Sequence, residues 1–161
     1  MFQILVVEDD FELNHTVCSF LNQRGYEATG CLNANDAYDA MYGKMFDLIV
    51  SDIMMPGIDG FEFAKTVRGL DENIPILFMT ARDDFASKQR GYRVGIDDYM
   101  VKPIDLDELF LRIGALLRRA KIASSPRTVD VYMTKLRGKL ARCNAFEIVT
   151  VHGLGYKAVI K

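Results

Sequence analysis

The first 121 positions alternate between two patterns of apolar and polar residues. Short continuous apolar runs, which are typical of strands covered on both faces, occupy residues 4–7, 48–50, 76–79 and 99–101. A weaker run at 26–31 predicts an edge strand. Between these runs apolar residues recur at every third or fourth position, as they do in amphipathic helices. Five strand–helix units in this order predict an α/β fold with a doubly wound, five-stranded parallel sheet.

Residues at the helix ends add detail to this prediction. Gly25 is expected to end the first helix, and Asn33 is expected to cap the start of the second. Residues 83–93 have helical spacing but few apolar side chains, so we expect this helix to be held loosely. Residues 106–117 carry a strong apolar stripe and predict the last helix of the sheet domain.

A second region follows residue 121. Two serines and a proline predict a short connector at 122–126. Residues 127–161 begin with a helical stripe of apolar side chains among basic ones. Two strand-like runs, 146–151 and 156–160, then flank a Gly-containing turn and predict a β-hairpin. The chain therefore divides into 1–121, 122–126 and 127–161.

The net charge of −2 conceals an asymmetry between these regions. Residues 1–125 carry 13 Lys+Arg and 20 Asp+Glu, whereas residues 126–161 carry 7 Lys+Arg and 2 Asp+Glu. An acidic body with a basic tail indicates an anionic partner for the tail, and DNA is the first candidate.

Composition also predicts where the protein works. No long apolar window and no leader-like start occur, so neither a membrane span nor a signal peptide is expected. Cys18, Cys31 and Cys143 are odd in number and scattered. They are predicted to be reduced thiols of a cytoplasmic protein, not a disulfide framework.

The candidate chemistry lies where the predicted strands end. Glu8 and Asp9 follow the first run, Asp52 the third, Thr80 the fourth and Lys102 the fifth. The carboxyl ends of parallel strands meet in one crevice, where ligands bind. Carboxylates suit Mg²⁺, while a hydroxyl and an ammonium suit phosphoryl oxygens. The residues therefore predict a site that places a phosphoryl group on a carboxylate.

Each residue of this site has an expected role. Asp52 is the predicted nucleophile, giving an aspartyl phosphate, with Thr80 and Lys102 stabilising the phosphoryl oxygens. Mg²⁺ is the expected cofactor, bound directly by Asp9 and Asp52 and through water by Glu8. Two further expectations concern the loop and the lysine: the backbone carbonyl of Met54 contacts the metal, and a cis peptide before Pro103 aims Lys102 inward.

An aspartyl phosphohydrolase is the rival enzymatic interpretation. Such enzymes carry a second aspartate two residues after the nucleophile, as a general acid. Met54 occupies that position here. The sequence therefore favours a protein that is phosphorylated and is not an enzyme.

Four segments resemble the receiver domain of two-component response regulators: 4–10, 51–60, 80–82 and 95–103. The resemblance covers residues 1–121 and implies a flavodoxin-like fold. It also implies phosphorylation of Asp52 by a sensor histidine kinase and a coupled switch of Thr80 and Tyr99. It suggests a symmetric homodimer on phosphorylation through the helix at 83–93, the fifth strand and the last helix. The charge pairs expected to match are Lys88 with Glu108, Asp97 with Arg118, and Asp98 with Arg112.

The tail resembles the last part of an OmpR/PhoB-type winged-helix domain. Residues 127–137 are similar to its recognition helix, and residues 150–156 to its wing. That domain normally starts with a small antiparallel sheet and two helices, which have no counterpart in this sequence. The resemblance implies a transcriptional regulator with an incomplete effector that binds DNA weakly. The expected DNA contacts are Arg127, Thr128, Tyr132, Lys135, Arg137 and Lys139. The alternative is a receiver that signals through protein contacts only, with the tail as a non-functional remnant.

Overall fold

The computed structural model describes residues 1–123, 146–151 and 155–160. Strands and helices alternate along the first of these ranges, as the apolar pattern predicts. The strands are β1 (Gln3–Val7), β2 (Glu27–Cys31), β3 (Leu48–Ser51), β4 (Ile76–Thr80), β5 (Asp98–Val101), β6 (Phe146–Val151) and β7 (Gly155–Ile160). The helices are α1 (Phe11–Gln23), α2 (Ala34–Gly43), α3 (Gly60–Leu70), α4 (Phe85–Val94) and α5 (Leu106–Ala123).

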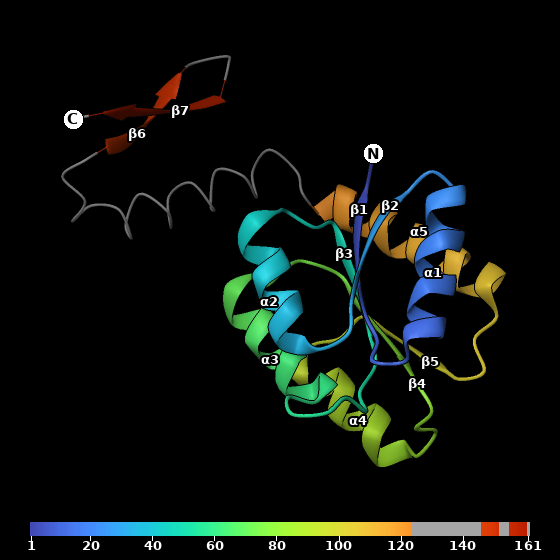
Figure 1. Ribbon diagram of the computed structural model, residues 1–161. Coiled ribbons are helices and arrows are strands. Elements are labelled where there is room, and N and C mark those ends of the chain that lie inside the picture. The colour runs from blue at the N-terminus through green and yellow to red at the C-terminus, as the bar shows by residue number, and fades with distance from the viewer. Residues whose placement is uncertain (124–145, 152–154, 161) are drawn as a thin grey trace. The chain divides into compact units, whose positions relative to one another are not determined.

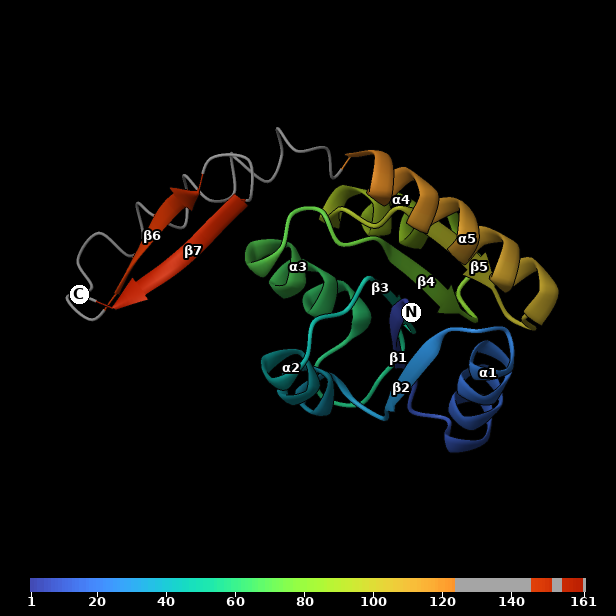
Figure 2. The ribbon, with the colours of Figure 1, turned by 90° about the horizontal axis from the view of Figure 1, so that it is seen from above.

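The first five strands form one parallel sheet in the order β2-β1-β3-β4-β5. Figures 1 and 2 show α1 and α5 on one face of this sheet and α2, α3 and α4 on the other. Because both faces are covered, the inner strands can be apolar at every position, which explains their continuous runs. The predicted doubly wound sheet is confirmed, and β2 lies at an edge as expected.

The core consists of two apolar layers, one on each side of the sheet. Successive side chains of a strand point to opposite faces. Ile76 and Phe78 of β4 accordingly pack with the α2–α3 side, whereas Leu77 and Met79 pack with α1 and α5. All four side chains are fully buried. This packing holds the central strands, and with them the residues that follow, in fixed positions.

Short polar side chains define the helix starts. Asn33 caps α2 by accepting the amide hydrogen of Asp36, as predicted, and Gly25 follows α1 with a φ of 90°. Asp84 caps α4 by accepting the amide of Ser87, so this helix begins at Phe85 rather than at residue 83. The sequence placed the start too early because two adjacent aspartates offer alternative caps.

The remaining described strands form a separate antiparallel hairpin. β6 pairs with β7 from Phe146 opposite Ile160 to Val151 opposite Gly155, which confirms the predicted pairing. The chain divides into two compact units, Met1–Ala120 and Lys121–Lys161. α5 continues through Ala123, two residues into the predicted connector, while the expected helix after residue 126 lies outside the described residues. In the described part of the chain, no helix is long and apolar enough to cross a membrane.

Candidate functional site

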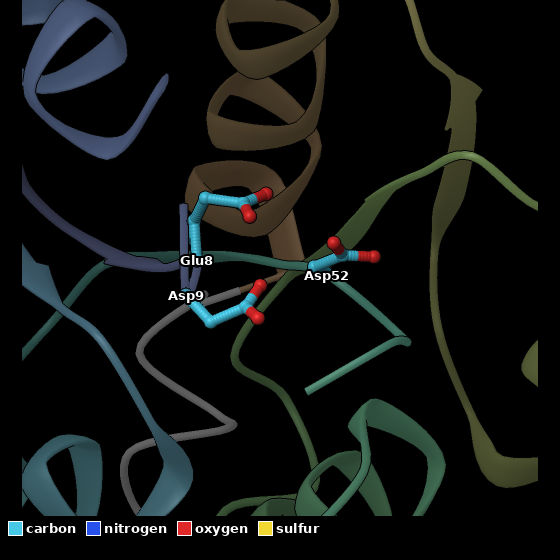
Figure 3. Close-up of side chains that lie close together, drawn as sticks. All are labelled: Glu8, Asp9 and Asp52. Carbon is cyan, nitrogen blue, oxygen red and sulfur yellow. The ribbon is translucent and has the colours of Figure 1, made fainter. Parts of the chain in front are cut away.

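Three carboxylates meet at the carboxyl end of the central strands. Glu8 and Asp9 directly follow β1, and Asp52 directly follows the neighbouring β3. The amide of Asp52 donates to the carbonyl of Val7 at 2.9 Å, which extends the ladder between the two strands. One oxygen from each carboxylate lies within 4.8 Å of the others (Figure 3). The predicted meeting of these three residues is confirmed.

Lys102 supplies a positive charge to this cluster. It follows β5, and the Lys102–Pro103 peptide is cis, as predicted. Its Nζ lies 2.8 Å from Glu8 Oε2 and 2.8 Å from Asp52 Oδ2. The side chains of Glu8 and Asp52 are only 1% and 5% exposed, whereas Asp9 is exposed to solvent. When all four groups are charged, the cluster keeps an excess of two negative charges, which a divalent cation would balance.

Burial and ion pairing act on these groups in opposite directions. Burial raises the pKa of Glu8, although hydrogen bonds from Lys102 and from the Asp10 amide partly oppose it. Burial would lower the pKa of Lys102, but its hydrogen bonds to Asp52 and Glu8 outweigh this effect and raise it. The ammonium therefore stays charged at neutral pH and binds the two buried carboxylates together.

The oxygen donors of the cluster fit a magnesium ion. Mg²⁺ prefers carboxylates, carbonyls and water over nitrogen or sulfur ligands. Asp9 of the cluster borders a cleft of about 370 Å³, whose other lining residues are Ile53, Met54, Met55, Pro56, Asp59 and Arg82. The amide of Met54 donates to Asp52 Oδ1 at 3.1 Å, so the loop that would offer the Met54 carbonyl also orients the carboxylate of Asp52.

Thr80 and Tyr99 are connected through the backbone of Arg82. Thr80 is fully buried at the end of β4, and its Oγ1 accepts a long hydrogen bond of 3.4 Å from the Arg82 amide. The hydroxyl of Tyr99 donates to the Arg82 carbonyl at 2.7 Å. Burial raises the pKa of Tyr99 to about 12, so this donor stays protonated. Sequence reasoning misses this role of Arg82, because nothing in its side chain indicates that its backbone links two other residues.

Five of the six residues expected to pair across a dimer form ion pairs within the described chain. Asp98 binds Arg112 at 2.7 Å, and Arg112 also binds Glu108 at 2.7 Å. Asp97 binds Arg68 of α3 at 2.9 Å. Arg68 also donates to three backbone carbonyls, those of Gly95, Asp71 and Ile74.

Two of the expected dimer residues remain. Lys88 binds Asp83 at 2.8 Å, which the sequence did not predict. Arg118 lies on α5, as expected. Sequence reasoning misses Arg68 because it lies on α3, 29 positions from Asp97, and misses Asp83 because it lies before the first turn of α4, outside the helix that carries Lys88. A dimer interface remains a prediction.

The residues expected to contact DNA belong to the tail. Arg127, Thr128, Tyr132, Lys135, Arg137 and Lys139 all lie outside the described residues.

Comparisons with known proteins cover mainly the sheet domain. Residues 4–114 match the family described as the response regulator receiver domain. The transcriptional regulatory protein PcoR of Escherichia coli is 37% identical over 121 residues, which are 75% of this chain and 54% of PcoR. The chain thus spans about half the length of that relative. The chemotaxis protein CheY4 of Vibrio cholerae has a similar structure, with a TM-score of 0.70 and 31% identity over 72% of this chain and 98% of CheY4.

The similarity to a further relative extends through the tail. The transcriptional regulatory protein RprY of Bacteroides fragilis is 28% identical over 222 residues, covering 98% of this chain and 94% of RprY. The alignment is longer than the chain, which has 161 residues. A stretch of RprY therefore has no counterpart in this sequence.

Proposed function

The chain belongs to the response regulator receiver family, and from this premise we propose that Asp52 accepts a phosphoryl group from a sensor histidine kinase in a two-component pathway. A receiver implies a histidine kinase as its partner and is not an enzyme in the usual sense. The observation that supports the proposal most strongly is the position of Asp52. Its carboxylate is 5% exposed, lies beside two further carboxylates and forms a 2.8 Å ion pair with Lys102.

The proposed reaction is an in-line displacement at phosphorus. An Asp52 carboxylate oxygen forms the new P–O bond as the P–N bond to the kinase histidine breaks, and the electron pair of that bond stays on the imidazole. Asp9 and Asp52 would hold Mg²⁺ directly, Glu8 through water, and the Met54 carbonyl would complete the protein ligands. Mg²⁺ supplies positive charge for the phosphoryl oxygens when it is bound.

Lys102 and Thr80 are proposed to hold the product. The Lys102 ammonium, now in contact with Asp52 Oδ2, would bind a phosphoryl oxygen once that carboxylate is phosphorylated. The Thr80 O–H would donate to a second phosphoryl oxygen. Movement of Thr80 would disturb the Arg82 amide and, through the Arg82 carbonyl, the hydrogen bond of Tyr99. This continuous contact supports the proposed coupling of Thr80 and Tyr99.

Phosphoryl uptake tests the proposal directly. Incubation with Mg²⁺ and acetyl phosphate should add one phosphoryl mass, and Asp52→Asn or a chelator should abolish it. Asp59→Asn is the matched control, because Asp59 lines the same cleft but caps α3 by accepting the Glu62 amide, a role that asparagine also performs. Equal uptake by wild type and Asp52→Asn would refute the assignment.

We propose that the output surface is a symmetric dimer through α4, β5 and α5. Phe85 and Tyr92 of α4 and Leu111 of α5 are large apolar side chains that are exposed in the single chain. Asp98 and Arg112 would exchange their present pairing for the same pairing between two copies. Because an exposed ion pair contributes only about 0–1 kcal/mol, the apolar contacts must supply much of the affinity.

Sedimentation at tens of micromolar protein, about the concentration at which a modest interface forms, tests this dimer. A beryllofluoride-treated sample should dimerise, and Arg112→Ala should weaken the dimer. Arg24→Ala is the control. Arg24, at the end of α1, forms a 3.2 Å ion pair with Asp107 of α5. Its loss also removes an arginine–aspartate pair, but one that joins α5 to α1, so the dimer should be unchanged. A treated wild-type sample that stays monomeric contradicts the proposal.

For the tail, we propose an OmpR/PhoB-type effector that lacks its first part. The alignment with RprY supports this, since it includes the tail and leaves part of the relative unmatched. The excess of positive charge in residues 126–161 would attract DNA phosphates. Without the antiparallel sheet and the two helices that normally support it, a recognition helix would show little preference among bases.

Competition between promoter and random DNA tests the proposed effector. We expect weak binding that falls steeply with salt and shows little preference between the two sequences. A strong preference for one site at physiological salt would refute the incomplete-effector proposal. If the protein binds neither DNA even at low salt, the alternative is favoured, a receiver that signals through protein contacts alone.

A further inference from the structure

Asn14 is a buried polar residue that connects the ends of two strands. It lies in α1, and only 5% of it is exposed. Its Nδ2 donates to the Glu8 carbonyl at 3.0 Å and to the Cys31 carbonyl at 2.9 Å. Only the amino end of an asparagine side chain can donate to two carbonyls, so the contacts fix how the amide is turned. Asn14 therefore joins the carboxyl ends of β1 and β2 from the helix above them.

The Glu8 carbonyl has a special position in the site. It belongs to the peptide group that joins Glu8 to Asp9, the two residues proposed to bind metal at the end of β1. Because a peptide group is planar, the direction of its carbonyl also fixes how the Cα atoms on both sides are oriented. β1 ends at Val7. The hydrogen bond from Asn14 thus orients the backbone that carries both carboxylates.

Further contacts hold the backbone and the carboxylate on either side of this peptide. The Glu8 amide donates to the Cys31 carbonyl at 3.0 Å, the same carbonyl that accepts from Asn14. The Asp10 amide donates to Glu8 Oε1 at 3.0 Å and orients the carboxylate itself. Asn14 completes this set of bonds from α1.

The sequence provides a fitted space for the Asn14 side chain. A Cβ added to Gly30 of β2 would collide with Asn14 Oδ1 and lie 3.1 Å from Cys18 Sγ. The Cys18 thiol lies 3.5 Å from Asn14 Oδ1 and donates to it. Glycine at position 30 is therefore required for Asn14 to reach the two carbonyls.

We propose that Asn14 is a positioning residue for the metal-binding carboxylates, holding the Glu8–Asp9 peptide in the orientation that binds Mg²⁺. This inference rests on the proposed function, because it presumes that the carboxylates bind the ion. Partners that orient metal ligands typically change metal affinity by about 10- to 100-fold when they are removed. Asn14 donates to the backbone carbonyl of Glu8 and would therefore act on the metal site through the backbone.

The test uses Asn14→Leu, which keeps a side chain branched at Cγ and does not lower helix propensity but removes the donor. Its matched control is Asn22→Leu. Asn22 also ties α1 to β2, since its Oδ1 accepts the Ala28 amide at 2.8 Å, but at the opposite end of the strand. Mg²⁺ affinity is measured by titration calorimetry, and phosphorylation by acetyl phosphate is followed as a function of Mg²⁺ concentration. Thermal unfolding with chelator reports the stability of each variant.

Asn14→Leu should raise the Mg²⁺ dissociation constant about tenfold or more, whereas Asn22→Leu should leave it unchanged. Phosphorylation of Asn14→Leu should need correspondingly more Mg²⁺ but approach the wild-type rate at saturation, which a loss of stability alone would not produce. Wild-type affinity in Asn14→Leu, or an equal loss in both variants, would overturn the inference. Wild-type protein that binds no Mg²⁺ would overturn the proposed function and this inference with it. If Asn14→Leu does not fold, Gly30→Ala displaces the same side chain and carries the same outcomes.

Discussion

Replacing Lys102 with methionine removes the cation that two buried carboxylates share. Each of the two contacts is 2.8 Å long, and one such contact has a gross attraction of about 6 kcal/mol at an effective dielectric constant of about 20. Desolvation offsets much of this energy, and breaking a buried pair typically costs about 3–5 kcal/mol. Lys102 is 21% exposed, so we expect the lower end, about 3 kcal/mol, in the absence of metal.

Melting temperatures measured with chelator and with Mg²⁺ separate an electrostatic effect of Lys102→Met from a general loss of packing. In chelator, the melting temperature of Lys102→Met should fall by about 6–12 °C, at about 2–4 °C per kcal/mol for a chain of this size. Mg²⁺ should recover more stability in the variant than in wild type, because the site then carries one more uncompensated negative charge. Mg²⁺ at about 100 times its dissociation constant raises the free energy of unfolding by about 2.7 kcal/mol.

Lys88→Met is the matched control for Lys102→Met. Lys88 pairs with Asp83 at the same distance, 2.8 Å, but both side chains are exposed, so its loss should cost only about 0–1 kcal/mol. The assay is thermal unfolding of the three proteins, followed by circular dichroism with chelator and with Mg²⁺. If Lys102→Met loses no more stability than Lys88→Met, or gains no more from Mg²⁺ than wild type does, the electrostatic reasoning is refuted.

Three further substitutions or titrations test other parts of the account. Gly60→Ala places a Cβ against the Asp52 carbonyl and 2.6 Å from Ile53 Cα. The variant should be less stable by about 1–3 kcal/mol in urea unfolding and should be phosphorylated more slowly. An unchanged stability and an unchanged rate would contradict this close packing. Tyr99→Phe removes the 2.7 Å hydrogen bond to the Arg82 carbonyl and should cost about 1 kcal/mol in the same assay; an equally stable variant would show that this bond contributes little. Burial raises the pKa of the Cys18 thiol to about 11, so in a Cys31→Ser, Cys143→Ser background its alkylation should be slow at pH 8 and rise about tenfold per pH unit. A rate that levels off near pH 9 would mean that the pKa of Cys18 is not raised.

The sheet and the site could be predicted from sequence because they depend on local patterns. A continuous apolar run such as residues 48–50 is compatible with a strand covered on both faces, and the structure places those residues in β3. Once the strands are ordered in a parallel sheet, topology alone brings Glu8, Asp9 and Asp52 to one edge. Residue types at strand ends therefore carried the information about the site.

Side chains that act across elements were not predictable in this way. Asn14 looks like an ordinary surface residue of a first helical turn, and its burial depends on where α1 crosses Gly30 of β2. Arg68 and Asp97 lie 29 positions apart, and their pairing depends on how the end of α3 approaches the turn before β5. The resemblance to receiver domains suggested a dimer interface for Asp97, and no pattern in the sequence indicated its contact with Arg68.

The location of the phosphoryl group tests the central claim most directly. After treatment with acetyl phosphate and Mg²⁺, borohydride reduction converts an aspartyl phosphate into homoserine, which peptide mass spectrometry can assign to one position. The account predicts homoserine at position 52 alone, with none in a sample treated in the presence of chelator. Homoserine at Asp9 or Asp59, or no conversion at position 52 in protein that has taken up a phosphoryl group, would contradict it.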